Sequence, residues 1–422
     1  MRNVFDQYKE PENRLTHALM ACLHEDAALL KQFVQWVTDA QLPTGSLTVQ
    51  EQSLPGVEEE PETSEDDQGG LPDGCIHNGE TWALVIESKI ASPLESDQMR
   101  RHRLSVGRRG FTEAILLAIV VRAPKTRVNE AYKVKEWTAV YLWFRAQKQS
   151  EWAKRLCSYM EALEAKLPRE QYLKDGTLTV FDGIRFGKEE PYSYPEAKRV
   201  IRLLMDELRS NSQIQSGFGV NPAIKGRGKI TGQESDHVWD YLPIGVSEEA
   251  RAFTEFPHLT VGIHRGFVQA LVVVPNGIRT DFRRALLDGG NEGFQQRFRS
   301  VVTNFREVIK DQVGATPIVE ADQRRYPSQR SEPFIDATIE FDLRTAFEND
   351  FGWETSPKRQ SQWLTAVYES LSQKRSNLQM AVGGRFQYDS CPWVGKPEIA
   401  KFLAKSWLAC KPIIDHMLKS GQ

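Results

Sequence analysis

Two carboxylates and a lysine stand close to a predicted turn in the first quarter of the chain. Glu87 and Lys89 are two positions apart at the end of the apolar run WALVI. Because side chains alternate along a strand, both would project to one side while Ser88 points to the other. Asp73 begins the segment DGCIH, and the Asn-Gly pair at 78–79 is the preferred centre of a type I′ turn. A hairpin folded about this turn predicts that Asp73 lies beside Glu87.

This grouping suits the hydrolysis of phosphodiester bonds. Asp73, Glu87 and the backbone carbonyl of Ser88 offer hard oxygen ligands to Mg²⁺. The metal can polarise a phosphate and lower the pKa of a bound water. Lys89 can orient or deprotonate that water and offset charge that develops on the phosphate. A buried ammonium among such groups is otherwise costly, so the cluster indicates function.

The same triplet also has a purely structural interpretation. Short charged triplets are common on exposed strands, and a surface ion pair between Glu87 and Lys89 would contribute about 0–1 kcal/mol to stability. The run WALVI, however, shows no polar alternation, which is typical of a central strand that is covered on both faces. The sequence therefore favours the catalytic interpretation.

The motif resembles that of a known family. Pro72-Asp73, followed by Glu87-Ser88-Lys89 fourteen positions after the aspartate, is similar to the signature of the PD-(D/E)XK nuclease superfamily. The resemblance covers roughly residues 10–145. It implies a restriction-endonuclease-like, three-layer α/β core with a mixed sheet, and dependence on Mg²⁺ or Mn²⁺. It also implies a nucleic-acid substrate, with DNA expected before RNA.

Two residues outside the hairpin extend the resemblance. Glu12, in PENRLTHAL, is similar to the helix-borne glutamate that opens many of these domains, and the resemblance implies that it also contacts the metal. Gln98, in SDQMRRHR, is similar to the glutamine on the helix after the core hairpin. That helix often carries a tyrosine four positions later, where this chain has His102, so the match is partial there. The implied catalytic set is Asp73, Glu87, Lys89, Glu12 and Gln98, and the implied metal contacts are Asp73, Glu87, Ser88 and Glu12.

Periodicity places this motif in an α/β region. An acidic stretch at 58–70 is interpreted as a solvated loop that precedes the hairpin. The apolar run at 114–121 is interpreted as a buried strand. The segment 137–144 fits either a strand or a strand that runs into a helix. The other expected elements are a helix at 11–40, a strand at 47–53, hairpin arms at 73–77 and 81–90, and helices at 95–106 and 151–167.

The pattern is interrupted near 168–175, which predicts a nuclease domain at 1–170 and a second α/β domain at 171–422. The second domain shows no convergent acid, base or metal-ligand set, so we expect a regulatory or substrate- or partner-binding role. Its expected elements are helices at 194–210 and 395–419, one or two helices across 278–311, strands at 258–264, 266–275, 334–343 and 378–389, and loops at 221–233 and 322–330.

The composition limits the remaining possibilities. The chain has 422 residues, 40% hydrophobic and 26% charged, as in soluble globular proteins. The formal net charge is −3, so positive charge for nucleic acid must be gathered locally. Five scattered cysteines predict neither a disulfide framework nor a zinc knuckle, and they fit a reducing cytoplasm. No apolar run is long enough to span a bilayer, so no membrane partner is expected.

Several basic segments have two interpretations each. The arginines that follow the motif fit either phosphate contact or a solvated helix face; they are Arg100, Arg101, Arg103, Arg108 and Arg109. GRGK at 226–229 lacks the spacing of a phosphate-binding P-loop. Phenylalanines between arginines fit the core better than a base-stacking platform; they are Phe282, Phe294, Phe298 and Phe305.

Two functions of different classes follow. The first is a metal-dependent DNA endonuclease, as in restriction or anti-phage defence, that acts as a homodimer or with a defence-system partner. The second is a non-enzymatic nucleic-acid-binding or sensor module built on a nuclease-like fold. The complete set of site residues favours the first.

Overall fold

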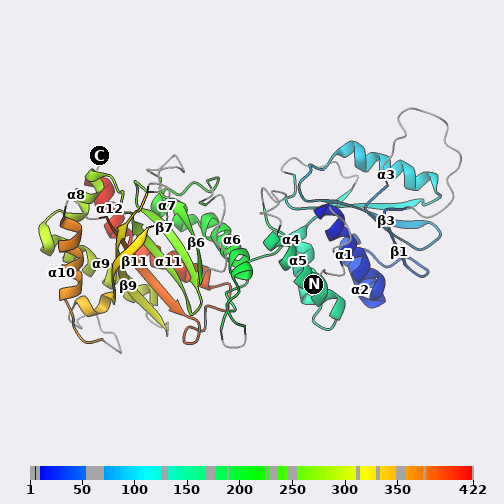
Figure 1. The fold of residues 1–422 in the computed structure, drawn as a ribbon. Coiled ribbons are helices and arrows are strands. Elements are labelled where there is room, and N and C mark those ends of the chain that lie inside the picture. Colours follow the sequence, from blue (N-terminus) through cyan, green and yellow to red (C-terminus); the bar gives the residue numbers. More distant parts are fainter. Residues whose placement is uncertain are drawn as a thin grey trace. The chain divides into compact units, whose positions relative to one another are not determined.

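The chain forms two compact units, Met1–Val180 and Phe181–Gln422, each described here by itself (Figure 1). The computed structural model describes residues 5, 10–53, 71–124, 132–166, 176–187, 190–224, 226–227, 236–245, 254–309, 314–328, 333–347, 357–373 and 377–420. The acidic stretch 58–70 and the boundary predicted at 168–175 lie outside these ranges. Each unit contains one sheet and its own helices, so the chain is of the α/β class.

The first unit begins with two helices where the sequence analysis expected one. α1 (Pro11–Glu25) ends at Asp26, which has an extended backbone, and α2 (Ala27–Thr38) begins immediately after it. The Asp26 carboxylate accepts a hydrogen bond of 3.0 Å from the Leu29 amide and so caps α2. The prediction of a single helix was wrong. The helical spacing of apolar residues continues on both sides of Asp26, but the extended backbone of Asp26 separates the two helices.

The sheet of the first unit has five strands in the order β1-β2-β3-β4-β5. Their bounds are β1 (Thr48–Glu51), β2 (Gly74–His77), β3 (Trp82–Lys89), β4 (Glu113–Val120) and β5 (Lys133–Glu136). β1, β2 and β3 pair antiparallel, whereas β3, β4 and β5 pair parallel. The sheet is therefore mixed, and β3 is the strand at which the direction changes. The predicted hairpin and the buried strand β4 are confirmed.

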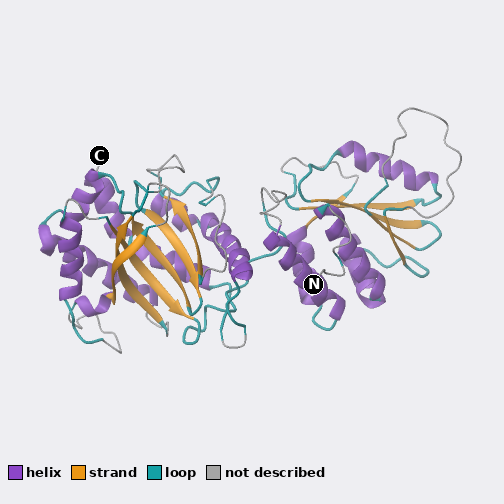
Figure 2. Ribbon diagram, viewed as in Figure 1, coloured by secondary structure: helices purple, strands orange, loops and turns teal. Residues whose placement is uncertain are grey.

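Helices cover both faces of this sheet (Figures 1 and 2). α3 (Ser96–Arg108) packs on one face, where Met99 and Val106 join a core with Val85 and Ala118. The other face packs against α1, α2, α4 (Trp137–Ala146) and α5 (Glu151–Lys166). The predicted helices at 95–106 and 151–167 are confirmed. Segment 137–144 is helical throughout, as part of α4. Both interpretations were wrong in giving this segment a strand, because the strand, β5, ends just before it.

The sheet of the second unit has six strands, all antiparallel, in the order β10-β9-β11-β8-β7-β6. Their bounds are β6 (His237–Pro243), β7 (His258–His264), β8 (Phe267–Val274), β9 (Ala315–Arg325), β10 (Phe334–Asp342) and β11 (Leu378–Gln387). The predicted strands at 258–264, 266–275, 334–343 and 378–389 are confirmed. The predicted loop at 322–330 was wrong for 322–325, which belong to β9.

Helices pack against one face of this second sheet, and Figure 1 shows α9 and α11 behind its strands. Phe282, Phe294, Phe298 and Phe305 are all buried there, which confirms their core role and excludes base stacking. The helices are α6 (Tyr194–Ser210), α7 (Ser212–Phe218), α8 (Thr280–Leu287), α9 (Gly290–Ile309), α10 (Gln362–Ser372), α11 (Ile399–Ala409) and α12 (Lys411–Ser420), with a short 3₁₀ turn at Leu343–Ala346.

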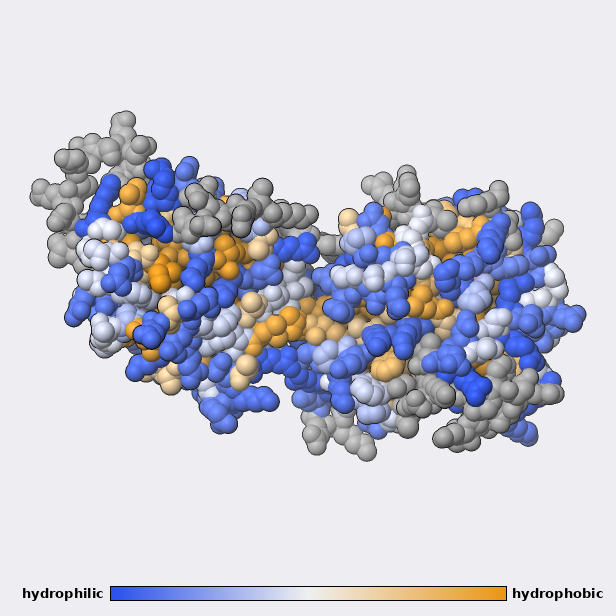
Figure 3. All heavy atoms as spheres, turned by 180° about the vertical axis from the view of Figure 1, so that it is seen from behind, coloured by the Kyte–Doolittle hydropathy of each residue, from blue (hydrophilic) through white to orange (hydrophobic). Residues whose placement is uncertain are grey.

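The surface seen in Figure 3 is mainly hydrophilic, with apolar side chains in scattered patches. Some exposure of apolar atoms is normal for a folded protein in water. Within the described ranges, no helix has the length and apolar character needed to cross a bilayer.

Candidate active site

The β2–β3 hairpin sets the geometry of the site. Its turn is closed by the Asn78 side chain, whose Oδ1 accepts hydrogen bonds of 3.0 Å from the amides of Glu80 and Trp82. Gly79 has a φ of 79°, a conformation that favours glycine. The resulting register pairs Gly74 with Ile86. In an antiparallel pair, the residue before Gly74 faces the residue after Ile86. Asp73 therefore lies opposite Glu87.

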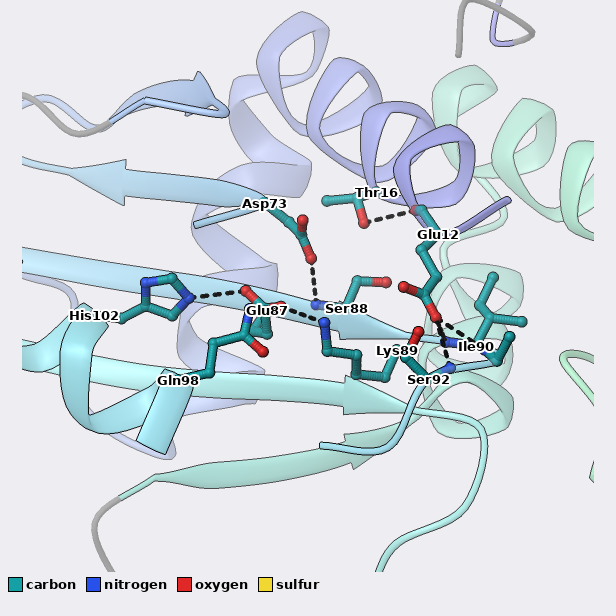
Figure 4. Close-up of polar contacts among 11 residues, drawn as sticks. Glu12, Thr16, Asp73, Glu87, Ser88, Lys89, Ile90, Ser92, Gln98 and His102 are labelled. Atoms are coloured by element: carbon teal, nitrogen blue, oxygen red, sulfur yellow. Dashed lines mark hydrogen bonds and ion pairs between the residues drawn. The ribbon is translucent and has the colours of Figure 1, made fainter. Parts of the chain in front are cut away.

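Asp73 reaches across to the neighbouring strand. Its Oδ2 accepts a hydrogen bond of 2.7 Å from the backbone amide of Ser88 (Figure 4). Burial, together with the charge of Glu87, raises the pKa of Asp73 to about 6, although the Ser88 bond and Lys89 act in the opposite direction. The ionised form is therefore unfavourable until a positive charge joins the site. A half-buried carboxylate whose pKa is raised in this way is typical of functional positions.

This charge predicts that Asp73→Asn stabilises the fold. The pKa of Asp73 is about 6 in the folded chain and 3.8 in its ordinary state. Protonation of Asp73 therefore stabilises the folded chain fully below pH 4, and this stabilisation is lost as the pH rises through 6. Asparagine keeps an acceptor for the Ser88 amide without the charge. We expect its free energy of unfolding at pH 8 to rise by about 1–3 kcal/mol.

Thermal unfolding in EDTA at pH 8 and pH 5 checks this prediction. The gain should shrink at pH 5, where the wild-type carboxyl already carries its proton. Asp97→Asn, on an exposed side chain of α3, is the matched control and should change little at either pH. A lower melting temperature for Asp73→Asn at pH 8 would contradict the interpretation.

Three donors hold the Glu87 carboxylate, which is almost fully buried. Gln98 Nε2 donates to Oε1 over 2.6 Å, and Lys89 Nζ lies 2.7 Å from the same oxygen. His102 Nε2 lies 3.0 Å from Oε2. Gln98 and His102 are four residues apart on α3, so both project from one helix face toward the strand (Figure 4). α3 therefore fixes the orientation of Glu87.

Opposing effects set the charges of Glu87 and Lys89. Burial alone would raise the pKa of Glu87, but hydrogen bonds from His102 and Lys89 and their charges lower it below its ordinary value. Burial alone would lower the pKa of Lys89, but the bond to Glu87 and the charges of Glu87, Glu12 and Asp73 raise it. At neutral pH the site thus contains an ionised Glu87 beside an ammonium group. In this state Lys89 can stabilise negative charge but cannot accept a proton.

His102 is the site residue that the sequence analysis missed. It enters the sequence analysis only as a mismatch with the tyrosine of the family pattern, yet it is buried and contacts Glu87 directly. One signal could have identified it: Gln98, Met99, His102 and Val106 lie at spacings of one, three and four, the pattern of an inward helix face. The outward face carries Arg100 and Arg103 instead.

Removing the His102 contact should impair any chemistry that depends on Glu87. His102→Ala leaves Oε2 of Glu87 without that donor. Residues that orient a metal ligand typically contribute about 10–100-fold to activity or metal affinity. We therefore expect His102→Ala to lower the cleavage rate by about 10–100-fold. His102→Gln can still donate and should recover part of it. Leu104→Ala, on the exposed face of the same helix, is the control. Rates of plasmid cleavage across a Mg²⁺ titration measure the effect, and a rate for His102→Ala within about twofold of the control would contradict it.

Glu12 lies at the same end of the sheet but makes a different contact. Its Oε1 accepts hydrogen bonds from three consecutive amides, those of Ile90 (2.9 Å), Ala91 (2.9 Å) and Ser92 (3.1 Å). These amides belong to the turn that directly follows Lys89 (Figure 4). Glu12 thus ties the start of α1 to the end of β3.

The donor set suits a divalent cation only in part. Asp73, Glu87 and the Ser88 carbonyl supply hard oxygens on adjacent strands, the chemistry that Mg²⁺ and Mn²⁺ prefer. In the part of the chain that the structure describes, however, no three His, Cys, Asp or Glu side chains form a group that could hold a metal. The oxygens available to a cation at this strand end are therefore those of two carboxylates and one backbone carbonyl.

The other basic segments take no part in the contacts described above. Arg100, Arg103 and Arg108 are exposed on α3. In the GRGK loop, the Arg227 guanidinium lies 4.1 Å from the centre of the Trp239 ring, and the Arg227 amide donates to Asp240 over 2.8 Å. That part of the loop is anchored to β6, and Lys229 lies outside the described residues.

The chain matches no protein-family model and no curated protein sequence. The interpretation of the site therefore rests on its residues and their geometry.

Proposed function

We propose that the first unit is a metal-dependent nuclease that hydrolyses phosphodiester bonds, with DNA as its substrate. One observation carries the proposal: the hairpin register places Asp73 opposite Glu87, with the Ser88 backbone between them and Lys89 on the Glu87 oxygen. Few structural roles would favour a buried and a half-buried carboxylate with an ammonium group at one strand end. A mixed sheet with helices on both faces supports a restriction-endonuclease-like core.

The residues of the chain have separable tasks in this mechanism. A divalent cation bound by Asp73, Glu87 and the Ser88 carbonyl would polarise the scissile phosphate and lower the pKa of a water. Gln98 and His102 keep Glu87 in place before substrate arrives, so no reorganisation is required. Lys89, already protonated, offsets negative charge on the phosphate. Its ammonium group lies 2.7 Å from a Glu87 carboxylate oxygen, and this contact keeps the proton on Lys89 at the start of the reaction.

The second unit is proposed to select the substrate or partner of the nuclease. Its described residues contain no metal-holding group of acidic, histidine or cysteine side chains. Pairing of two copies, or association with a defence-system protein, would suit a cytoplasmic enzyme that cuts both strands of DNA. Light scattering of the full chain measures the number of copies.

A non-enzymatic nucleic-acid-binding or sensor module is the second candidate. The observation in its favour is that protein donors already satisfy the carboxylates of Glu12 and Glu87. A module of this kind would bind nucleic acid equally with and without Mg²⁺ and would leave it intact.

A panel of substrates tests the proposal. The full chain is incubated with supercoiled DNA, single-stranded DNA and RNA, each with Mg²⁺, with Mn²⁺ and with EDTA, and binding is followed in parallel in Ca²⁺. The nuclease proposal expects products from DNA in Mg²⁺ or Mn²⁺ and none in EDTA. Binding without products under every condition would favour the sensor module.

A further inference from the structure

We propose that Glu12 is a positioning residue that holds the turn after Lys89, and that it is not a metal ligand. This inference rests on the proposed nuclease function and revises the metal contact expected for Glu12 from the sequence. Its basis is the capture of three successive backbone amides by one carboxylate oxygen. The bonds join residues that are 78 to 80 positions apart in the chain.

The contact has the strength that a positioning role requires. Hydrogen bonds from amides to an ionised carboxylate are about twice as strong as neutral ones. Three consecutive N–H groups that converge on one point form a concave site of positive potential, which suits an anion. Glu12 is also in the first turn of α1, where the helix dipole favours a negative charge. The three amides and the dipole of α1 therefore both favour an ionised Glu12 in its observed position.

Helix α1 contacts both arms of the hairpin that carries Asp73, Glu87 and Lys89. At one end, Glu12 fixes residues 90–92, which continue directly from Lys89. Further along α1, Met20 packs on Gly74, the residue after Asp73, so closely that a Cβ added to Gly74 would lie 2.7 Å from the Met20 sulfur. α1 thus contacts the chain beside Asp73 and beside Lys89, and Glu12 makes the second of these contacts.

Two observations separate Glu12 from the metal ligands. Asp73 and Glu87 are directly opposite each other in the hairpin. Glu12 instead points from the start of α1 to the turn that contains Ile90 and Ser92 (Figure 4). The described residues also contain no group in which a third acidic side chain joins two others around a point that could hold a metal.

The amide and alanine variants of Glu12 distinguish positioning from metal binding. The Oε1 of glutamine can still accept amide hydrogen bonds but supplies no charge to a metal, whereas alanine does neither. We expect Glu12→Ala to lose on the order of 10²-fold in cleavage, the typical effect of a misplacement of about 1 Å. Glu12→Gln should keep its rate within about tenfold of the wild type, because neutral hydrogen bonds remain. Glu10→Gln and Glu10→Ala, at the exposed helix cap without a side-chain bond, control for lost charge.

Two further measurements do not depend on cleavage. Hydrogen exchange of the peptide that contains residues 90–92 should accelerate in Glu12→Ala and stay near wild type in Glu12→Gln. Mn²⁺ affinity, measured by calorimetry on the full chain, should change little in Glu12→Gln. Equal loss of Mn²⁺ affinity in both Glu12 variants, with unchanged exchange, would overturn the proposal and make Glu12 a ligand. If the wild type cleaves nothing, the nuclease proposal fails, and the exchange and Mn²⁺ results still decide the role of Glu12.

Discussion

Glu87→Gln is expected to lower the rate of DNA cleavage by on the order of 10³-fold, because it removes a charge from the proposed metal site, whose metal would supply several kcal/mol of stabilisation to the transition state. The amide also disturbs the local hydrogen bonds. Glu87 accepts from Gln98 and His102 on different oxygens, and an amide can accept through only one of them. Cleavage under saturating Mg²⁺ and Mn²⁺ affinity are the two measurements.

The control for this variant is Glu113→Gln, an exposed position at the start of the neighbouring strand β4. It should cleave as the wild type does. Circular dichroism of Glu87→Gln should show intact secondary structure, because the substitution keeps the size of the side chain. Near wild-type cleavage by a folded Glu87→Gln protein would exclude Glu87 from the reaction.

Lys89→Met is expected to reduce cleavage by about 10²–10³-fold, the typical cost of removing one group that stabilises charge in the transition state. The pKa of Lys89 is raised by its contact with Glu87, so its contribution at neutral pH is a positive charge. Lys89→Arg keeps that charge and should therefore retain more activity than Lys89→Met. Single-turnover cleavage at pH 7 and pH 9 measures both variants.

The comparison of the two Lys89 variants identifies the role of the side chain. If arginine is as inactive as methionine, the ammonium group supplies more than charge. If methionine cleaves at the wild-type rate, Lys89 is a structural partner of Glu87 and the proposed mechanism is wrong. Lys135→Met is a suitable control, since that lysine lies on β5 over the Trp36 ring, at 4.6 Å from its centre.

The hairpin could be predicted because its determinants are local. The Asn-Gly pair and the two apolar arms predict a hairpin here, but not its register. A two-residue type I′ turn at Asn78-Gly79 would pair His77 with Glu80 and Asp73 with Leu84. The observed connection is longer and pairs His77 with Ala83, which places Asp73 opposite Glu87. Gln98 was predicted through the resemblance to the nuclease signature, in which a glutamine stands on the helix after the core hairpin. The observed hydrogen bond from Gln98 to Glu87 needs only that this helix packs over the strand.

The contacts of His102 and Glu12 could not be predicted in the same way. Helical spacing from Met99 and Val106 indicates that His102 faces inward, but only the packing of α3 on the sheet places it against Glu87. Glu12 binds amides 78 positions or more away, a contact set by where α1 docks. Sequence periodicity indicates that a helix exists but does not say which backbone groups its first turn meets.

In the second unit, strands with weak patterns were missed. β9 contains Pro317 and ends in a run of polar residues, and both features argue against a strand when taken alone. It is nevertheless paired on both sides, with β10 and β11. β6 was missed because Asp240 interrupts its apolar and aromatic residues, although Asp240 is buried and accepts hydrogen bonds from the Arg227 and Tyr241 amides. Tertiary pairing outweighed local propensity in both strands.

The most direct test of the nuclease proposal is the rate at which the full chain cuts supercoiled DNA as Mg²⁺ is raised from zero. The proposal predicts a rate that rises to saturation, that EDTA abolishes, and that Asp73→Asn and Glu87→Gln both reduce to background while remaining folded. A cleavage rate that is unaffected by EDTA, or that survives in both variants, would contradict a metal site formed by Asp73 and Glu87. Intact DNA at every Mg²⁺ and Mn²⁺ concentration would contradict the nuclease function itself.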